Sequence, residues 1–336
     1  MKKILVVNVN WLGDVLFSTP ALKALREKYP AAHIACLVVS RCEEVLKNNP
    51  RINEIIVYDE YEKHRSLFAK YRFIRMLRKK KFDTVYILHQ SLKRAMIGFL
   101  AGIPNRYGYN TKGRAFLLTY AVPAPEEALH KIDYFLNLLR ECGIKAQDRN
   151  CEFFTNEDDQ KQACAILAKI GISENAPYVI MNPGGNWFLK RWPIDYFAKV
   201  SDLLIEQKGL KVIISGSKKD VGLAKKMLAK MKNKAVIISG QVSLGQLGVL
   251  MRKAQAVVSA DSGPMHIASS VGANTVAIFG PTSVELTGPV GAGKTIILQN
   301  KIDCEIPCYK LSCPDNRCMA SVSSQQVYDA VCKFLR

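Results

Sequence analysis

The chain has 336 residues, 49% of them hydrophobic, and a formal charge of +19 at pH 7. This length exceeds that of one ordinary domain and suffices for two packed cores. No run of about eighteen apolar residues occurs, which excludes a membrane-spanning segment, and without an export signal the ten cysteines are expected to be reduced thiols. The positive charge predicts anionic partners, such as nucleotides, phosphorylated glycolipids or an acidic lipid leaflet.

The first half of the chain alternates short β-branched runs with longer amphipathic segments. Strands are predicted over residues 4–9, 33–39, 54–58 and 84–88. Apolar strands separated by helices indicate a parallel sheet covered on both faces. The opening segment is interpreted as the first strand and not as a signal peptide, because Asn8 ends its apolar run. The protein is therefore expected in the cytoplasm.

Asp14 follows the first predicted strand, at the point where a helix begins. A carboxylate at the carboxyl edge of a sheet can accept the proton of an attacking hydroxyl. Aspartate is also a preferred helix N-cap, and this segment alone favours the cap by about two to one. A helix N-terminus lowers the basicity of a carboxylate, so a base at this place needs desolvation.

A strongly basic segment extends from His64 to Lys81, with apolar residues at helical spacing. A helix that packs on the core and exposes a cationic side accounts for this pattern. The alternative is a surface that receives a phosphorylated acceptor at the membrane, through Arg65, Arg72 and Arg75. No recognised nucleic-acid motif accompanies the segment, so nucleic acid is not expected as a partner. The apolar positions are Leu67, Phe68, Tyr71, Ile74 and Leu77.

A second strand series follows a predicted helix that ends at Gly171. Its strands are expected over residues 178–182, 211–216, 235–240, 256–261 and 275–280. The predicted fold class is α/β, with two Rossmann-like doubly wound domains that face a central cleft and bind ligands at the carboxyl ends of their strands. The expected domains are 1–172 and 173–320, followed by a C-terminal helix in 321–336 with a capping box formed by Ser323 and Gln326.

The clearest indication of a site lies after residues 256–260, in the segment from Asp261 to His266. Pro264 suits the first turn of a helix, so backbone N–H groups and the helix dipole face the strand end. Ser262 can donate a hydroxyl, Gly263 permits close approach of a phosphate, and His266 adds an N–H donor. Each residue alone also fits a cap or a helix surface, but the set favours an anion pocket.

Three further loops open after strands of this second series. The loop after residues 178–182 offers glycine amides, Asn186 and Lys190, whose ammonium is a compact partner for phosphate. A surface lysine is usually only solvated, so Lys190 alone carries little weight. The turn after residue 216 contains Asp220, which suits a ribose or phosphate site, and Thr282 follows the last predicted strand.

Residues 288–295 match the P-loop pattern G-x-x-x-x-G-K-T letter for letter. A P-loop requires a strand directly before it and a helix directly after it. Here a turn-rich stretch precedes the match and a strand-like run follows it, so the match is interpreted as accidental. A P-loop NTPase remains the alternative of another class, and a non-catalytic protein that binds anions by charge alone is a further one.

Four cysteines lie close together near the C-terminus, at Cys304, Cys308, Cys313 and Cys318. Four thiolates suffice in number for zinc or an iron–sulfur cluster. Their spacing matches neither the paired cysteines of zinc ribbons nor the ferredoxin pattern. No metal or other cofactor is expected, and a metal at these cysteines is the minority hypothesis.

Together these motifs resemble the lipopolysaccharide heptosyltransferases of glycosyltransferase family 9, over nearly the whole chain. The resembling segments are LVVNVNWLGDVLFSTPALKALREKYP, NPGGNWFLKRWP, GSKKD, GQVSLGQLGVLM, SADSGPMHIASSVGANTVAIFGPTS and EIPCYKLSCPDNRCM. The resemblance is strongest to the branch that adds the second heptose of the inner core. It implies a GT-B fold and inverting transfer of heptose from the nucleotide-sugar co-substrate ADP-heptose to a lipid-linked oligosaccharide acceptor. A transferase of the same fold with another nucleotide sugar or acceptor is the nearest alternative.

The resemblance also implies residue roles. Asp14 is implied as the general base, which reverses the preference for a cap, and Lys190 as a contact to the donor phosphates. Some relatives place an acidic residue on the donor ribose where this chain has Lys218, which makes Asp220 the substitute. The expected donor-binding residues are Asn186, Lys190, Asp220, Asp261, Ser262, Gly263, His266 and Thr282. The expected acceptor-binding residues are Gly13, Arg65, Arg72 and Arg75, with peripheral contact to an anionic inner membrane.

Overall fold

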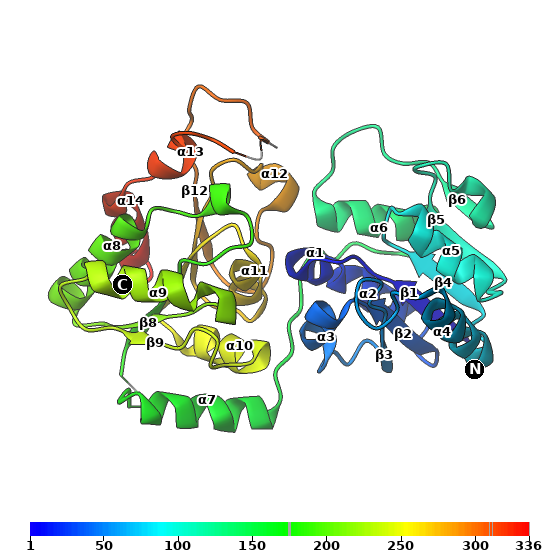
Figure 1. Ribbon diagram of the computed structural model, residues 1–336, viewed down its shortest axis with the longest axis horizontal. Coiled ribbons are helices and arrows are strands. Elements are labelled where there is room, and N and C mark those ends of the chain that lie inside the picture. Colours follow the sequence, from blue (N-terminus) through cyan, green and yellow to red (C-terminus); the bar gives the residue numbers. More distant parts are fainter. Residues whose placement is uncertain (174–175, 309, 311, 336) are drawn as a thin grey trace. The chain divides into compact units, whose positions relative to one another are not determined.

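A computed structural model describes residues 1–173, 176–308, 310 and 312–335. The chain divides into two compact units, Met1–Glu152 and Phe153–Arg336. Each unit contains a parallel β-sheet with helices packed against it (Figure 1). The predicted α/β class is confirmed in both halves.

The sheet of the first unit has the strand order β3-β2-β1-β4-β5-β6, and all neighbours are parallel. Its strands are β1 (Lys3–Val7), β2 (His33–Val38), β3 (Glu54–Val57), β4 (Thr84–Ile87), β5 (Asn105–Tyr109) and β6 (Tyr120–Val122). Its helices are α1 (Leu12–Phe17), α2 (Thr19–Lys28), α3 (Ser40–Leu46), α4 (Leu67–Lys80), α5 (Leu92–Leu100), the 3-10 turn η1 (Ala115–Leu117) and α6 (Lys131–Glu141). The apolar pattern did not reveal β5, because Asn105, Arg106 and Gly108 interrupt it.

The sheet of the second unit has the order β12-β11-β10-β7-β8-β9 and is again parallel. Its strands are β7 (Tyr178–Asn182), β8 (Lys211–Ile214), β9 (Val236–Ile237), β10 (Ala256–Ala260), β11 (Thr275–Ile278) and β12 (Thr295–Leu298). Its helices are α7 (Glu157–Lys169), η2 (Phe188–Lys190), α8 (Ile194–Lys208), η3 (Lys218–Asp220), α9 (Val221–Lys230), α10 (Leu244–Lys253), α11 (Gly263–Ser270), α12 (Val284–Thr287), α13 (Arg317–Ala320) and α14 (Ser324–Cys332). The strand expected over 235–240 is reduced to β9.

The compact units do not divide at residue 172, where the sequence placed a boundary. Helix α7 packs on α10 of the second unit, so the division falls between Glu152 and Phe153. The segment that leads into α7 also packs closely on α10, because a Cβ on Gly248 of α10 would lie 2.9 Å from the ring of Phe153. The C-terminal helix α14 is not separate either, since Val327 and Val331 are buried in the core of the second unit. Residue 336 and the linker residues 174–175 lie outside the described residues.

Helix α4 departs from the core-packing pattern expected of it. Its buried residues are Phe73 and Leu77, which face the core of the first unit. The side chains of Leu67, Phe68 and Tyr71 are instead exposed. Their spacing is helical, but they occupy the helix face that points away from the sheet. Among the described residues, no helix has the length and apolar character needed to cross a membrane.

Candidate active site

The strand order of the second sheet creates a switch point between β7 and β10. The chain continues from β7 outward to β8 and from β10 outward to β11 on the opposite side, so the loops after these two strands diverge. Ligands of doubly wound folds bind at such points, outside the carboxyl ends of the strands. Asn182 ends β7 beside Ser259 of β10. Its buried amide Nδ2 lies 3.0 Å from Ser259 Oγ and 3.2 Å from Ser262 Oγ.

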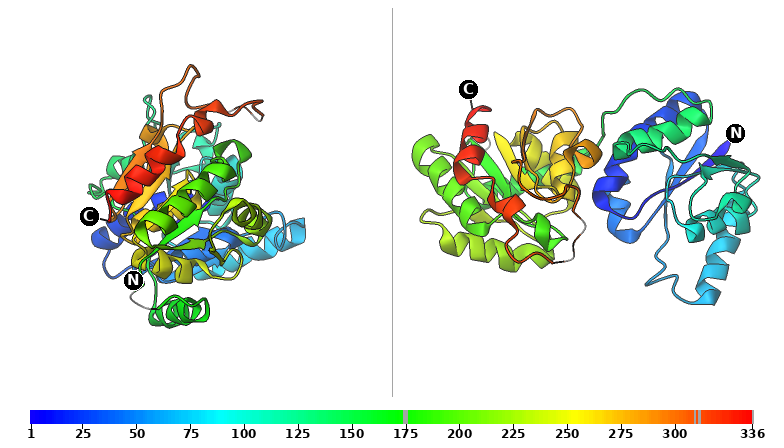
Figure 2. Two further views of the ribbon diagram at one scale, coloured as in Figure 1. Left: turned by 90° about the vertical axis from the view of Figure 1, so that its left-hand side faces the viewer. Right: turned by 90° about the horizontal axis from the view of Figure 1, so that it is seen from above.

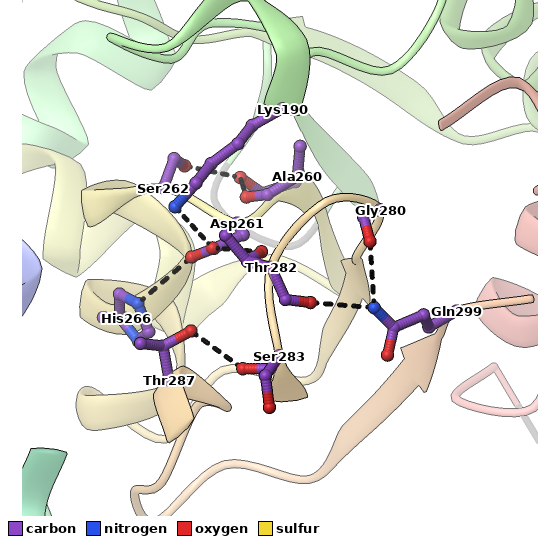
Figure 3. A network of polar contacts seen from close by, with 11 residues as sticks. Lys190, Ala260, Asp261, Ser262, His266, Gly280, Thr282, Ser283, Thr287 and Gln299 are labelled. Atoms are coloured by element: carbon purple, nitrogen blue, oxygen red, sulfur yellow. Dashed lines mark hydrogen bonds and ion pairs between the residues drawn. The ribbon is translucent and has the colours of Figure 1, made fainter. Parts of the chain in front are cut away.

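Asp261 follows β10 and is the centre of a polar cluster (Figure 3). Its carboxylate Oδ2 accepts a hydrogen bond from Lys190 Nζ at 2.6 Å and one from Thr282 Oγ1 at 2.7 Å. The other oxygen, Oδ1, lies 3.7 Å from His266 Nε2. The structure thus brings together four of the predicted donor-binding residues from three different segments of the chain, namely Lys190, Asp261, His266 and Thr282.

The Asp261 carboxylate is only 6% exposed. Burial by itself would raise the pKa of this group, but the nearby His266 imidazole and the positive charge of Lys190 outweigh it and hold the pKa at about 2. Asp261 is therefore ionised at neutral pH and fixes the positions of three donor side chains. Both of its carboxylate oxygens face residues of the protein.

Helix α11 begins at Gly263, directly after this cluster. Ser262 is the N-cap residue, yet its hydroxyl does not cap the helix; it contacts Asn182 and Ser259 instead. Pro264 lies in the first turn and has no N–H group. The positive end of the helix dipole therefore points to the strand end where Lys190 lies, as an anion pocket requires.

Hydrogen bonds from Trp192 and Gln299 hold the two loops that carry Lys190 and Thr282. The indole Nε1 of Trp192 donates to the carbonyl of Val322 at 2.8 Å. The amide Nε2 of Gln299 donates to the carbonyls of Gly280 and Thr282, at 3.1 and 2.8 Å (Figure 3). Lys190 and Thr282 therefore sit on anchored loops.

Asp220 and Asn186 lie at the edge of this site. The carboxylate of Asp220 accepts hydrogen bonds from the backbone N–H and the hydroxyl of Ser217, at 2.9 and 2.6 Å, which closes the turn before α9. A Cβ on Gly184 would lie 2.6 Å from Asp220 Cγ, so this turn adjoins the Lys190 loop. Asn186 is exposed in that loop. Its side chain is not part of the Asp261 cluster.

The first sheet has a corresponding switch point between β1 and β4. A pocket of about 190 Å³ opens beside their carboxyl ends, and among the described residues Asp14 is the only acidic one that lines it. Asp14 lies within the first turn of α1, whose N-cap is Trp11, so the interpretation of Asp14 as the cap is wrong. The polar residues lining the pocket are Asn10, Asp14, His89, Gln90, Lys112, Lys131 and Tyr134.

Buried cations lie behind this pocket. Arg94 and Arg114 are both fully buried, and Arg94 Nη2 donates to Asn10 Oδ1 at 3.2 Å. Burial, followed by the charges of Arg94 and Arg114, lowers the pKa of His89 to about 4, so its ring is neutral at pH 7. With Lys112 and Lys131 in the lining, positive groups predominate around Asp14.

Comparison with known proteins identifies the family. Residues 70–317 match the model of glycosyltransferase family 9 (heptosyltransferase). The chain belongs to glycosyltransferase family 9. It is 28% identical to lipopolysaccharide heptosyltransferase 2 of Escherichia coli K12, over 88% of this chain and 87% of that protein. It is 31% identical to lipooligosaccharide heptosyltransferase 2 of Haemophilus ducreyi, over 88% of both chains.

Solved structures of family 9 proteins have the same architecture. The glycosyl transferase family 9 protein of Veillonella parvula is 26% identical, with a TM-score of 0.88 over 99% of this chain and 97% of that chain. E. coli ADP-heptose lps heptosyltransferase II is 25% identical, with a TM-score of 0.83 over 100% and 98%. The GT-B fold class and the glycosyltransferase activity implied by the sequence resemblance are thereby confirmed.

In this family 9 protein, residues 288–295, which match the P-loop pattern, are not flanked by the elements that a P-loop requires, as the sequence indicated. Helix α12 precedes it and strand β12 follows it, the reverse of a P-loop. A Cβ on Gly291 would overlap the carbonyl oxygen of Ser269, and one on Gly293 would overlap that of Ala273. These glycines permit close packing against α11 and the turn after it.

The cysteine segment of the family 9 protein packs beside the Thr282 loop. The backbone N–H of Cys308 donates to the carbonyl of Pro281 at 2.7 Å, and a Cβ on Gly280 would lie 3.2 Å from Cys318 Sγ. Within the described residues, no three His, Cys, Asp or Glu side chains are grouped as metal ligands would be. The expectation that Cys304, Cys308, Cys313 and Cys318 bind no metal stays a prediction.

Some predicted residues of the family 9 enzyme lie outside both sites, and others were missed. Arg65, Arg72 and Arg75 are exposed and do not line the Asp14 pocket, and Gly13 lies in α1 next to Asp14. His89 follows β4. The expectation that functional residues follow strands, which selected Asp261, could therefore also have selected His89. The other residues that sequence reasoning missed are Asn10, Gln90, Lys112, Lys131, Tyr134, Asn182, Ser259 and Gln299.

Proposed function

We propose that this family 9 glycosyltransferase transfers heptose from ADP-heptose to the inner core of a lipopolysaccharide, with inversion at the anomeric carbon. The similar proteins of E. coli and H. ducreyi carry the names of heptosyltransferases 2, and the similar E. coli structure is described as an ADP-heptose enzyme. The observation that carries the proposal is the Asp261 cluster, which holds the Lys190 ammonium beside the N-terminus of α11.

The Asp261 cluster suits the diphosphate of a nucleotide sugar. Lys190 supplies a cation, and the start of α11 at Gly263 supplies backbone N–H groups and a positive dipole. Both favour negative charge, which grows on the diphosphate as the sugar leaves, so their contacts are stronger in the transition state than in the ground state. Asp261 is a positioning residue in this scheme, because it orients Lys190, Thr282 and His266.

Asp14 is the proposed general base. It lines a pocket with polar and cationic walls, which suits a sugar hydroxyl on an anionic acceptor. The hydroxyl oxygen attacks the anomeric carbon from the face opposite the diphosphate, and its proton passes to the Asp14 carboxylate. The bond between the anomeric carbon and the phosphate oxygen breaks, ADP leaves with the electron pair, and the configuration at the anomeric carbon inverts.

The test is heptose transfer by the Asp14→Asn protein, followed by mass spectrometry of the acceptor glycolipid. Loss of the base should lower kcat by about 10²–10⁴-fold. ADP affinity should stay unchanged, because Lys190 and Asp261 are intact. Glu43→Gln is the matched control, since Glu43 also lies in the first turn of a helix but is exposed and outside the pocket. Full turnover by Asp14→Asn would refute the base assignment.

Calorimetric titration with ADP, UDP and GDP tests the donor independently. Preference for ADP supports the proposal. Preference for UDP or GDP would support a sugar-nucleotide-dependent transferase but contradict ADP-heptose as its donor. Absence of binding to all three would contradict the assignment of the Asp261 cluster to a nucleotide diphosphate.

A further inference from the structure

Helix α4 exposes an apolar group that no part of its own unit covers. The exposed fractions are 83% for Leu67, 70% for Phe68 and 60% for Tyr71. These three residues form the first turns of the helix, while Phe73 and Leu77 face the core. In Figure 2 the light-blue helix α4 stands out from the body of the first unit. Exposed large apolar side chains in contiguous groups mark surfaces that bind a partner.

The same face of α4 is cationic further along. Tyr71 and Arg75 follow Leu67 at intervals of four residues, and Arg72 follows Phe68 at the same interval, so all five project to one side. The guanidinium of Arg72 lies 5.9 Å from the centre of the Phe68 ring. Residues 63–82 contain no Asp or Glu, so α4 itself carries charge of a single sign.

A neighbouring helix lies at the other end of α4. The guanidinium of Arg78 donates through Nη2 to the carbonyl of Leu100 at 2.9 Å, which joins the C-terminal ends of α4 and α5. On α5 the side chains of Met96, Phe99 and Leu100 are also exposed. The apolar and cationic surface considered below is therefore that of α4 alone.

We propose that this face of α4 docks on an anionic lipid bilayer, with Leu67, Phe68 and Tyr71 entering the headgroup region and Arg72 and Arg75 meeting lipid phosphates. Aromatic and aliphatic groups gain free energy on leaving water at this depth, and each nearby cation adds attraction to an anionic leaflet. The occupant is a bilayer because charge of one sign alternates with large apolar groups on one helix face. The inference goes beyond the proposed reaction, which it would serve by bringing the enzyme to a lipid-borne acceptor.

The experiment is co-sedimentation of the full chain with phosphatidylcholine vesicles, with and without phosphatidylglycerol, in the absence of donor and acceptor. The wild-type protein should bind the phosphatidylglycerol vesicles preferentially. Phe68→Ser should weaken this binding about tenfold, since one exposed aromatic side chain loses its burial in lipid. The matched control is Phe116→Ser, because Phe116 is 72% exposed in the same unit but lies on η1.

The charge contribution is measured with Arg75→Gln, which should weaken binding by about fivefold. Its control is Lys145→Gln, an exposed cation outside α4. Unchanged ADP binding by each variant verifies its fold. Equal loss with Phe116→Ser, no loss with Phe68→Ser, or equal binding to both vesicle types would overturn the proposal. So would RNA binding that depends on Phe68 where vesicle binding does not. Because no sugar transfer is measured, these results are independent of the proposed reaction.

Discussion

Lys190 and Asp261 form an ion pair in which the carboxylate is buried and the ammonium is partly exposed. The Lys190 ammonium lies 2.6 Å from the carboxylate, so its position is fixed before any phosphate binds. Its side chain is one-quarter exposed, whereas that of Asp261 is buried. The ammonium is therefore the partner that a ligand reaches.

Lys190→Ala should weaken ADP binding by about 10–100-fold, since a hydrogen bond to a charged group contributes roughly 1.5–3 kcal/mol. Isothermal titration calorimetry measures this change. Lys208→Ala is the control, because it removes an exposed cation from the last turn of α8. An unchanged dissociation constant for Lys190→Ala would exclude Lys190 from the donor site.

The lowered pKa of Asp261 predicts a pH dependence of stability. Its pKa is about 2 in the folded protein against an ordinary value of 3.8. A carboxyl group with a lowered folded pKa stabilises the folded state above its unfolded pKa and loses this contribution as the pH falls toward its folded pKa. The stability difference between wild type and Asp261→Asn should therefore shrink by on the order of 2 kcal/mol between pH 4 and pH 2.

Urea unfolding of both proteins across this pH range measures the difference. Asp195→Asn serves as the comparison, because Asp195 makes an exposed ion pair with Lys230 that water screens. A constant difference between wild type and Asp261→Asn would show that the Asp261 cluster does not stabilise the ionised carboxylate.

At the scale of elements, the packing of α7 on α10 decides to which unit α7 belongs. Gly248 lies in α10 against Phe153, and Gly245 lies against the Asp159 carboxylate at the start of α7. Asp159 is part of the capping box with Asn156 that begins this helix. The glycines of α10 allow α7 and the segment before it to approach closely. The sequence alone does not reveal this contact, because the contacting residues are far apart along the chain.

Gly248→Ala should destabilise the protein by about 1–3 kcal/mol, because the new methyl group would overlap the Phe153 ring. The midpoint of chemical unfolding measures the loss. Gly222→Ala is the matched control in α9, since a Cβ there has open space around it, and it should be neutral or stabilising. Equal effects of the two substitutions would contradict the close packing.

At the scale of the whole molecule, the protein carries a formal charge of +19 and is proposed to bind two kinds of anion, a lipid bilayer and ADP. The two kinds of binding should depend differently on salt concentration. Attraction of an exposed cationic face to a bilayer is screened over roughly 8–10 Å at moderate ionic strength. The proposed contacts of ADP to Lys190 and α11 are local, and Lys190 is partly buried. Raising the salt concentration should therefore release the protein from anionic vesicles while ADP binding weakens less. If vesicle binding, measured by sedimentation, and ADP binding, measured by calorimetry, weaken equally as the salt concentration rises, the proposal of two separate binding surfaces is contradicted.

The sequence by itself determined the two strand series, the loops after them and the family resemblance. These features are local: apolar runs, glycine and proline positions, and the segment from Asp261 to His266 all lie within short stretches. The rejection of the P-loop match also followed from its immediate neighbours.

The tertiary structure alone decided which of these loops meet. Lys190 and Asp261 are far apart in sequence, and only the adjacency of β7 and β10 brings their loops together. The place of Lys112 in the lining of the Asp14 pocket was also decided by the tertiary structure, because Lys112 follows β5, a strand too polar to be recognised from the sequence. The same holds for α4, where helical spacing gave the apolar positions but only packing against the sheet decided that Phe73 is buried and Phe68 exposed.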